Sequence, residues 1–192
     1  PGENGFDYSN NHTHLHKYKG KWYLFYHSMN LRHHLGVKGG YRNVSVEEIP
    51  VDEEAVTIEM IPATYEGVGQ IETLDPFAIQ QMETTAGTKD VKFEAYGDAG
   101  NMVALSTGTG SILVRGVEFR KKARRLTINA MGTGRLEVRE NNPTGKLVAV
   151  MDINSPETAQ TKVRLLASPS YTTDLCFLFN GADLRLDCWR FR

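Results

Sequence analysis

The sequence is poor in the features that would assign a chain to a class at a glance. Its 192 residues include two cysteines and seven prolines, and no apolar run approaches the ~20 residues that a membrane-spanning helix needs. Charge of neither sign dominates, since 22 Lys and Arg stand against 23 Asp and Glu. The net charge of -1 gives no global reason to expect nucleic acid or a membrane as a partner. A hydrophobic content of 40% predicts a globular chain with its own core.

Histidine is absent from most of the chain, because all six histidines lie between His12 and His34. So sharp a change in composition indicates two units with different roles. A Gly-rich stretch followed by a Leu-Asp-Pro-Phe turn places the boundary between residues 67 and 76, which predicts units 1–70 and 75–192. A start methionine and a leader are also missing, and we expect the chain to be a carboxy-terminal piece of a longer protein.

The two cysteines, Cys176 and Cys188, flank a turn at residues 180–183. If the flanking strands form a hairpin, the thiols lie opposite each other and a cross-strand disulfide is possible. The alternative is two buried thiols that act as small hydrophobic side chains. The sequence leaves both open.

Helical periodicity is weak, whereas short alternating runs bounded by Gly, Asn, Asp and Pro recur throughout. The pattern predicts an all-β fold. In the first unit it predicts four strands, the dimensions of one blade of a β-propeller, at residues 13–18, 21–28, 41–49 and 56–60. In the second unit it predicts a β-sandwich of the jelly-roll kind, with strands at residues 79–83, 91–94, 102–105, 111–115, 124–130, 135–140, 146–151, 162–167, 174–179 and 184–191.

The first unit resembles the closing blade of glycoside hydrolase family 43, the five-bladed propeller group of β-xylosidases and α-L-arabinofuranosidases. The matching strings are Asn-Asn-His at 10–12, Lys-Gly-Lys-Trp-Tyr-Leu-Phe-Tyr-His at 19–27, Gly-Tyr-Arg at 40–42 and Val-Ser-Val at 44–46. The second unit resembles a family 6 carbohydrate-binding module. Its strings are Leu-Asp-Pro-Phe at 74–77, Met-Glu-Thr at 82–84, Gly-Val-Glu-Phe at 116–119, Leu-Glu-Val-Arg at 136–139, Pro-Thr-Gly at 143–145 and Leu-Asp at 186–187.

The resemblance implies an inverting hydrolase whose catalytic carboxylates lie on earlier blades, outside this sequence. Inversion needs an acid and a base ~6.5–9.5 Å apart. Acids of the first unit crowd one strand and its turn, and Glu47 and Glu48 point to opposite faces because they are adjacent on a strand. We interpret this group as a solvated edge, so the chain alone is not expected to hydrolyse glycosides and has no catalytic residue of its own. The group comprises Glu47, Glu48, Asp52, Glu53, Glu54 and Glu59.

The same resemblance implies that two residues of the blade contribute to substrate binding. His12 matches a histidine near the propeller axis that holds a metal or water network below the sugar. Arg42 matches an arginine that reaches toward the substrate. A satisfied interior histidine and a surface arginine are the plain alternatives. A zinc site on the alternating residues His14 and His16 with His12 is a weaker possibility, because no cysteine lies nearby.

In the second unit, the resemblance implies a sugar cleft made of two aromatic residues and an asparagine. Ser106 occupies the first aromatic position, the loop expected at residues 155–162 contains no aromatic, and Arg185 replaces the asparagine. The usual cleft is therefore predicted to be degenerate. Tyr96 or Tyr171 would be a substitute platform, although each is equally a packing residue.

These modules also hold a structural calcium ion. Glu83 and Asp187 match two of its ligands, and Gln81 stands where a further carboxylate is expected. Hydrogen bonds from the acids to adjacent turns are the alternative. One cationic cluster remains, at a turn, and we interpret it as a solvated surface: Arg115, Arg120, Lys121, Lys122, Arg124 and Arg125.

The prediction is a carboxy-terminal portion of a family 43-like glycosidase, with a sandwich that braces the propeller or binds plant polysaccharide. Its expected partners are the missing amino-terminal propeller blades and a cell-wall polysaccharide such as xylan or arabinoxylan. A structural calcium is the only cofactor considered, and a secreted or periplasmic location is expected. The alternative function is a stand-alone carbohydrate-binding or structural interaction module without catalysis.

Overall fold

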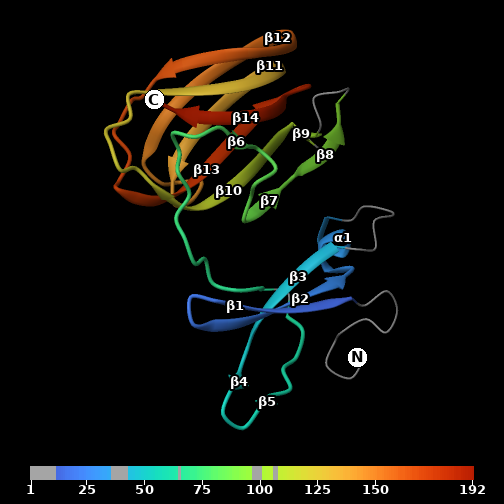
Figure 1. The fold of residues 1–192 in the computed structure, drawn as a ribbon. Coiled ribbons are helices and arrows are strands. Elements are labelled where there is room, and N and C mark those ends of the chain that lie inside the picture. Colours follow the sequence, from blue (N-terminus) through green and yellow to red (C-terminus); the bar gives the residue numbers. More distant parts are fainter. Residues whose placement is uncertain (1–11, 36–42, 65, 97–100, 106–107) are drawn as a thin grey trace. The chain divides into compact units, whose positions relative to one another are not determined.

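The structure, a computed structural model, describes residues 12–35, 43–64, 66–96, 101–105 and 108–192. The chain divides into two compact units, Pro1–Gln70 and Ile71–Arg192 (Figure 1). Nearly all regular structure is β-strand, so the all-β prediction is confirmed. No helix of the described part is long and apolar enough to cross a membrane.

The first unit is built on an antiparallel three-stranded sheet in the order β1 (Thr13–Tyr18), β2 (Lys21–Ser28), β3 (Asn43–Ile49). A two-residue turn at Lys19 and Gly20 joins β1 to β2, and both residues have positive φ, 49° and 81°. Two successive positive φ values give a turn whose twist matches that of the strands, and glycine adopts the second at no steric cost. The sequence signal Lys-Gly-Lys therefore fixes the register of the hairpin.

The fourth strand of the blade departs from the prediction. Residues 56–60 do not join the sheet; instead β5 (Thr57–Ile58) pairs with β4 (Val51–Asp52) as a separate two-stranded ladder. The carboxylate of Asp52 accepts hydrogen bonds from the backbone N–H groups of Glu54 and Ala55, at 3.0 and 2.9 Å. This local turn closes the hairpin of β4 and β5. A short helix, α1 (Asn30–Leu35), which the sequence analysis did not predict, follows β2.

Glu47 corrects the interpretation of the acidic group as a solvated edge. Its side chain is buried, with 5% of its surface exposed, whereas Glu48 is exposed and pairs with Lys21 at 2.9 Å. The Glu47 carboxylate accepts hydrogen bonds from the backbone N–H of Thr64 at 2.7 Å and from the hydroxyl of Tyr26 at 3.2 Å. Glu47 therefore ties the segment that leaves the unit to its sheet. Alternation along β3 predicted the opposite directions of the two acids, but not which of them is covered.

Replacing Glu47 with alanine is expected to destabilise the first unit by about 1–3 kcal/mol. The substitution removes the acceptor of both the Thr64 N–H and the Thr64 hydroxyl, and a donor left without its acceptor costs free energy. Limited proteolysis at residues 50–70, followed by mass spectrometry, measures the local loss of protection. Glu48→Ala on the same strand is the matched control and should leave the cleavage rate unchanged; equal acceleration by both variants would contradict the assignment.

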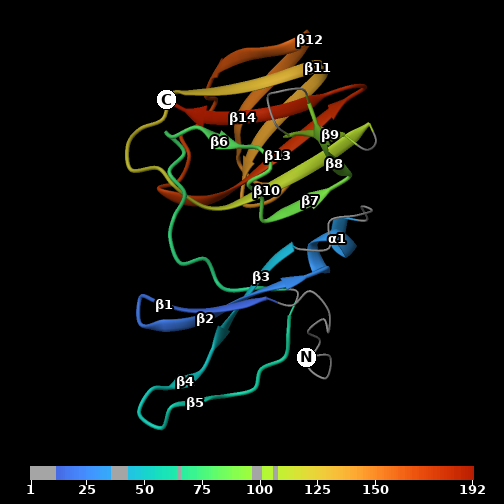
Figure 2. The same cartoon turned by 45° about the vertical axis from the view of Figure 1, so that its right-hand side comes forward.

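The second unit is a β-sheet that curls on itself into two facing layers (Figures 1 and 2). The strand order is β7-β10-β13-β11-β14-β9-β8, with β12 also paired to β11 and β6 to β14. The strands are β6 (Gln80–Gln81), β7 (Gly87–Lys89), β8 (Val91–Ala95), β9 (Asn101–Leu105), β10 (Thr109–Glu118), β11 (Arg125–Glu140), β12 (Leu147–Arg164), β13 (Thr172–Gly181) and β14 (Arg185–Phe191).

Strand β11 connects the two layers, because it pairs with β14 over residues 126–131 and with β13 over residues 134–140. The alternation pattern predicts two strands here and two more along β12, and these divisions are wrong, because β11 and β12 are each continuous. The chain bends at Gly132, which has φ of 96°, and the register with β12 shifts between Ala130 and Gly132. A bulge with a glycine bends a strand without ending its ladder, so each strand continues around the corner. Residues 155–162, expected as a loop, belong to β12.

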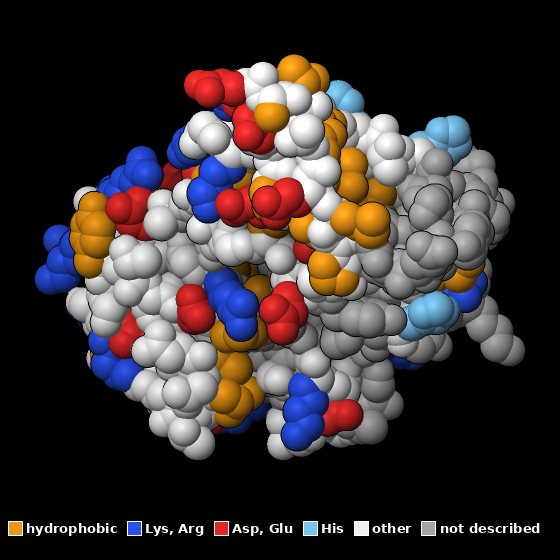
Figure 3. Space-filling model, turned by 90° about the horizontal axis from the view of Figure 1, so that it is seen from below, with side chains coloured by type: hydrophobic (Ala, Val, Ile, Leu, Met, Phe, Trp, Pro, Cys, Tyr) orange, Lys and Arg blue, Asp and Glu red, His pale blue; other side chains and the backbone are white. Residues whose placement is uncertain are grey.

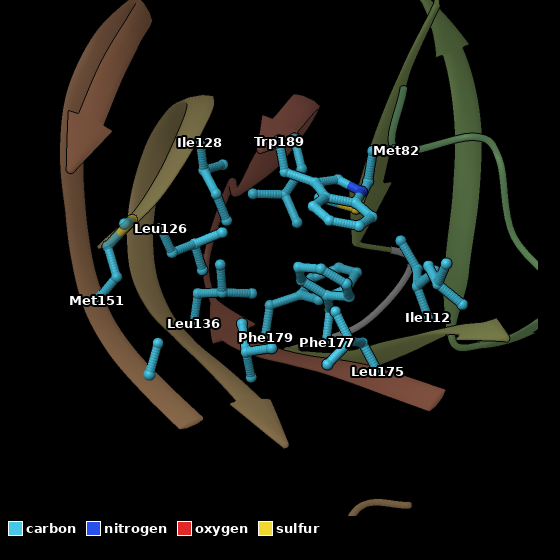
Figure 4. Close-up of a cluster of buried hydrophobic side chains, with 14 of the residues drawn as sticks. Met82, Ile112, Leu126, Ile128, Leu136, Met151, Leu175, Phe177, Phe179 and Trp189 are labelled. Atoms are coloured by element: carbon cyan, nitrogen blue, oxygen red, sulfur yellow. The ribbon is translucent and has the colours of Figure 1, made fainter. Parts of the chain in front are cut away.

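The core of the second unit lies between these layers (Figure 4). Phe177 and Leu175 of β13 lie on one side, and Trp189 of β14 with Leu126 and Ile128 of β11 on the other; all are at most 1% exposed. The rings of Phe177 and Trp189 have centroids 5.2 Å apart. Aromatic side chains that bury large areas dominate such a core, so this unit has the means to fold without the first.

The hairpin predicted between the two cysteines is absent from the structure. Strands β13 and β14 do not pair with each other; Cys176 lies opposite Leu113 and Arg139, and Cys188 opposite Asn129 and Gln81. The turn between them crosses from one layer to the other instead of folding back within a layer. Both thiols are free.

Neither thiol is expected to react readily in the folded protein. Burial and the neighbouring carboxylate of Asp187 raise the pKa of Cys188 to about 11, and burial also raises the pKa of Cys176. At pH 8 about one Cys188 in a thousand is then the reactive thiolate. Titration with Ellman's reagent should be slow in the native protein and give both thiols after unfolding without reductant. Fewer thiols after unfolding would mean that a disulfide exists.

Candidate functional site

Four histidines of the blade, His12, His14, His16 and His27, lie along one face of the sheet. His12 precedes β1 and its ring lies 5.6 Å from the ring of His27 in an edge-to-face arrangement, while His14 and His16 stack at 5.9 Å. Among the described residues, no group of three or more His, Cys, Asp or Glu side chains is arranged to hold a metal ion. The alternating histidines therefore do not form the zinc site considered from sequence. Arg42 lies outside the described residues, and the role of His12 stays a prediction.

Apolar side chains of the first unit reach the surface. Val44 is 71% exposed on β3, and Val56 and Met60 are 86% and 81% exposed beside the β4–β5 ladder. Figure 3, seen from below, shows hydrophobic side chains at the surface between charged ones. Few apolar side chains of this unit are buried, in contrast to the core of the second unit. Such a surface is typical of a contact site, because it costs free energy in water.

Arg185 is held in an ionic network at the position where the resemblance places a sugar-binding asparagine. Its Nε donates to Glu94 at 3.1 Å, and its terminal nitrogen Nη1 pairs with Asp183. Lys92 also pairs with Glu94. Hydrogen bonds from Lys92 and Arg185 hold the pKa of Glu94 below its ordinary value. The guanidinium is therefore committed to carboxylates of the chain itself. Ser106, the other cleft position, lies outside the described residues.

The two substitute aromatic residues lie at different strand ends. Tyr96 directly follows β8 and is 36% exposed, and Tyr171 directly precedes β13 and is 63% exposed. The carbonyl of Tyr171 accepts a hydrogen bond from the Phe119 N–H, which fixes the backbone of that turn. Tyr171 thus presents the larger exposed ring, and a stacking role for it stays a prediction.

An open groove of about 560 Å³ lies at the corner where β11 bends, and the sequence analysis missed it. The Thr133 hydroxyl donates to the Asn154 side-chain oxygen at 3.3 Å, and Arg135 pairs with Asp152 at 3.3 Å. Asn180 lines the opposite side. Hydroxyl, amide and charged groups suit a polyhydroxylated ligand. No local pattern marks these residues, because they come from three strands that the register brings together.

The backbone segments that carry the three candidate calcium ligands lie next to each other, because β6 pairs with β14. Gln81 pairs with Cys188, and the Met82 N–H donates to the Asp187 carbonyl at 2.8 Å. One carboxylate oxygen of Glu83 is buried and has no hydrogen-bond partner among the described residues. Burial raises the pKa of Cys188, and the negative charges of Asp187 and Glu83 raise it further. A buried carboxylate oxygen without a hydrogen-bond partner fits a hard cation.

A single known protein matches both units of the chain. No protein-family model matches the sequence. The chain is 29% identical over 190 residues to an arabinoxylan arabinofuranohydrolase of Bacillus subtilis strain 168, a match that covers 91% of this chain and 37% of that protein. The chain thus spans little more than a third of that relative.

Solved structures agree on the fold. A family 43 arabinoxylan arabinofuranohydrolase from Bacillus subtilis, crystallised with cellotetraose, matches 95% of this chain and 41% of its own with a TM-score of 0.78 and 24% identity. A family 6 carbohydrate-binding module from Clostridium stercorarium, in complex with cellobiose, matches 64% of this chain and 98% of its own with a TM-score of 0.58 and 15% identity. At such identities these structures show the fold alone.

The blade and the sandwich together are therefore similar to part of a glycoside hydrolase family 43 arabinoxylan arabinofuranohydrolase. A match to a family 6 carbohydrate-binding module shows that fold in the chain as well. The resemblance drawn from the sequence is thereby confirmed, and so is the combination of a propeller blade with a β-sandwich.

Proposed function

We propose that this chain is the carboxy-terminal portion of a glycosidase that removes arabinose or xylose units from arabinoxylan. The observation that carries the proposal is the match to an arabinoxylan arabinofuranohydrolase, which runs across 91% of the chain and so includes both units in order. The blade belongs to the catalytic propeller, and the sandwich is its accessory module.

The partner of the blade is the rest of the propeller. A three-stranded sheet with few buried apolar side chains and with Val44, Val56 and Met60 exposed needs other surfaces to cover it. We assign that cover to the preceding blades, which also carry the catalytic acid and base. His12 and Arg42 then face the substrate, with imidazole orienting water and guanidinium donating to sugar oxygens. Since plant polysaccharide lies outside the cell, we propose a secreted or periplasmic location.

The sandwich contacts polysaccharide through the corner groove of Thr133, Asn154 and Asn180. The position of the usual cleft is less suited to a sugar, because Arg185 there is paired with Glu94 and Asp183. Amides present both donors and acceptors to sugar hydroxyls. The variant Asn154→Ala with Asn180→Ala should weaken binding of arabinoxylan oligosaccharides about tenfold in calorimetry. The variant Asn142→Ala, outside the groove, is the control, and unchanged binding by the groove variant would contradict the assignment.

We further propose a structural calcium ion held by Glu83, Asp187 and the side-chain oxygen of Gln81. When bound, the ion supplies positive charge that satisfies the buried oxygen of Glu83 and fastens β6 to β14. Calcium should therefore raise the melting temperature of the second unit, and Glu83→Gln should abolish the increase. Glu137→Gln, on β11, is the control. A melting temperature that ignores calcium and chelator alike would exclude the ion.

The function is tested on native material isolated with an antibody against this chain. We expect a species larger by about 20 kDa, the mass of four blades of ~40–50 residues, that releases arabinose or xylose from arabinoxylan. The 192-residue chain alone should release none. A native species of this length that is folded and binds polysaccharide without hydrolysis would support a stand-alone binding module instead, and one that does neither would support a structural module.

A further inference from the structure

The outer face of the sheet formed by β12, β11 and β14 carries an array of cations that the sequence does not reveal. Leu126 and Ile128 of β11 face the core, so Arg125 and Thr127 between and beside them face outward. The register with β12 and β14 places a basic residue on each side of both positions. We call this array the cationic face: Arg125, Lys162, Arg164, Arg190 and Arg192.

The cations form two rows across three neighbouring strands. In the first row Arg164 lies opposite Arg125, and Arg125 exchanges two backbone hydrogen bonds of 2.8 Å with Arg192. In the second row Lys162 and Arg190 flank Thr127. Strands lie ~4.8 Å apart, so each row spans about 10 Å. β12, β11 and β14 lie side by side in this order at the top of Figure 1.

Within the part of the chain that the structure describes, no acidic side chain pairs with this array. Among the described residues, none of the five cations forms an ion pair, although Arg120, Arg135, Arg139 and Arg185 elsewhere in the unit all do. Like charges directly opposite each other on neighbouring strands destabilise a sheet. The fold therefore holds an arrangement that opposes its own stability and that a bound anion would relieve.

The groups around the cations suit a sugar as well as an anion. In the row next to Lys162 and Arg190, Asn129 and Gln160 face outward beside a small hollow of about 30 Å³ that Thr127 and Arg190 also line. At the other end, Lys122 and Arg124 join Arg164 along a groove of about 430 Å³. Amides beside guanidinium groups match hydroxyls beside carboxylates.

We propose that the cationic face binds an acidic polysaccharide whose sugars carry carboxylate groups, that is, a chain containing uronic acids. Arginine is the side chain best matched to carboxylate, because its planar fork donates two parallel hydrogen bonds. A nucleic acid fits less well, since the two rows and the amide row contain no aromatic residue on which a base could stack. The choice of a glycan among polyanions rests on the carbohydrate-directed function proposed above.

Binding of polygalacturonate, which has a carboxylate on every sugar, tests the proposal with the 192-residue protein in affinity electrophoresis. Binding should be strong at low salt and weaken as salt rises. The double variant Arg125→Gln with Lys162→Gln should bind about tenfold more weakly. The double variant Arg120→Gln with Arg139→Gln removes the same charge from paired residues outside the face and should change binding less than about twofold.

Thermal unfolding supplies a second readout that does not need the ligand. Arg125→Gln should raise the melting temperature at low salt and lose this effect at high salt, because it relieves repulsion within the first row. A melting temperature lowered at both salts would mean that Arg125 serves packing, and would overturn the assignment.

Three further results would overturn the proposal: no binding of polygalacturonate, equal weakening by both double variants, or binding of duplex DNA as tight as that of polygalacturonate. Neutral arabinoxylan, assayed in parallel, reports on the groove of Asn154 and Asn180. If the cationic face does not bind polygalacturonate, the arabinoxylan assay still tests the proposed function separately.

Discussion

Gly132→Ala is expected to destabilise the second unit by about 3 kcal/mol or more. Gly132 has a φ of 96°, a backbone angle that residues other than glycine rarely adopt. An added Cβ would lie 1.8 Å from the carbonyl oxygen of Asp183, a backbone atom that cannot swing away. The corner of β11 and the turn between β13 and β14 must therefore separate, and both layers lose their connection.

Denaturant unfolding followed by tryptophan fluorescence measures this effect, since Trp189 is buried in the same unit. Gly108→Ala is the matched control, because the added Cβ has no atom within 4 Å apart from its chain neighbours and the φ of Gly108 lies outside the left-handed range. That variant should unfold within about 0.5 kcal/mol of the wild type. If Gly132→Ala behaved like its control, the bend in β11 would not depend on glycine.

Phe177→Ala is expected to cost about 3–5 kcal/mol and to lower the melting temperature by about 10 °C or more. Phe177 is fully buried at the centre of the core, and its ring contacts that of Trp189 (Figure 4). Removing it eliminates this aromatic contact and leaves a cavity that neighbours on two facing layers cannot fill without shifting.

Calorimetric melting of the wild type and the variant provides the measurement. Leu166→Ala serves as the control, because this leucine is 65% exposed in the same unit and its loss creates no cavity. A small effect of Phe177→Ala, similar to that of the control, would show that the layers close over the site and that the core is looser than its burial implies.

Only some of the candidate sites can be predicted from short stretches of the sequence. Gln81, Glu83 and Asp187 were singled out by resemblance, and the structure brings their strands together because β6 pairs with β14. Arg185 was predicted to spoil the aromatic cleft, and the structure adds that Glu94 holds it there. The corner groove and the cationic face escaped notice, since each is assembled from strands distant in sequence.

The charged residues of the turn before β11 illustrate the same limit. Arg124 and Arg125 were interpreted as part of a solvated turn, on the basis of their neighbours in the sequence. Their neighbours in space are Arg164, which follows them by some forty residues, and Arg192 at the last position. The composition of a segment reports nearby charge along the chain, whereas electrostatic energy depends on distance through space.

The sequence by itself determined the all-β class, the hairpin at Lys19 and Gly20, and the succession of a blade and a sandwich. These features depend on alternation and turn chemistry, which act over a few residues. Tertiary structure alone decided that Glu47 is buried, that β11 turns the corner at Gly132, that the cysteines lie in separate layers and that the cations line up across three strands. The physical reason is that burial and register are set by which strands pair, and pairing partners are chosen by the packing of the whole core.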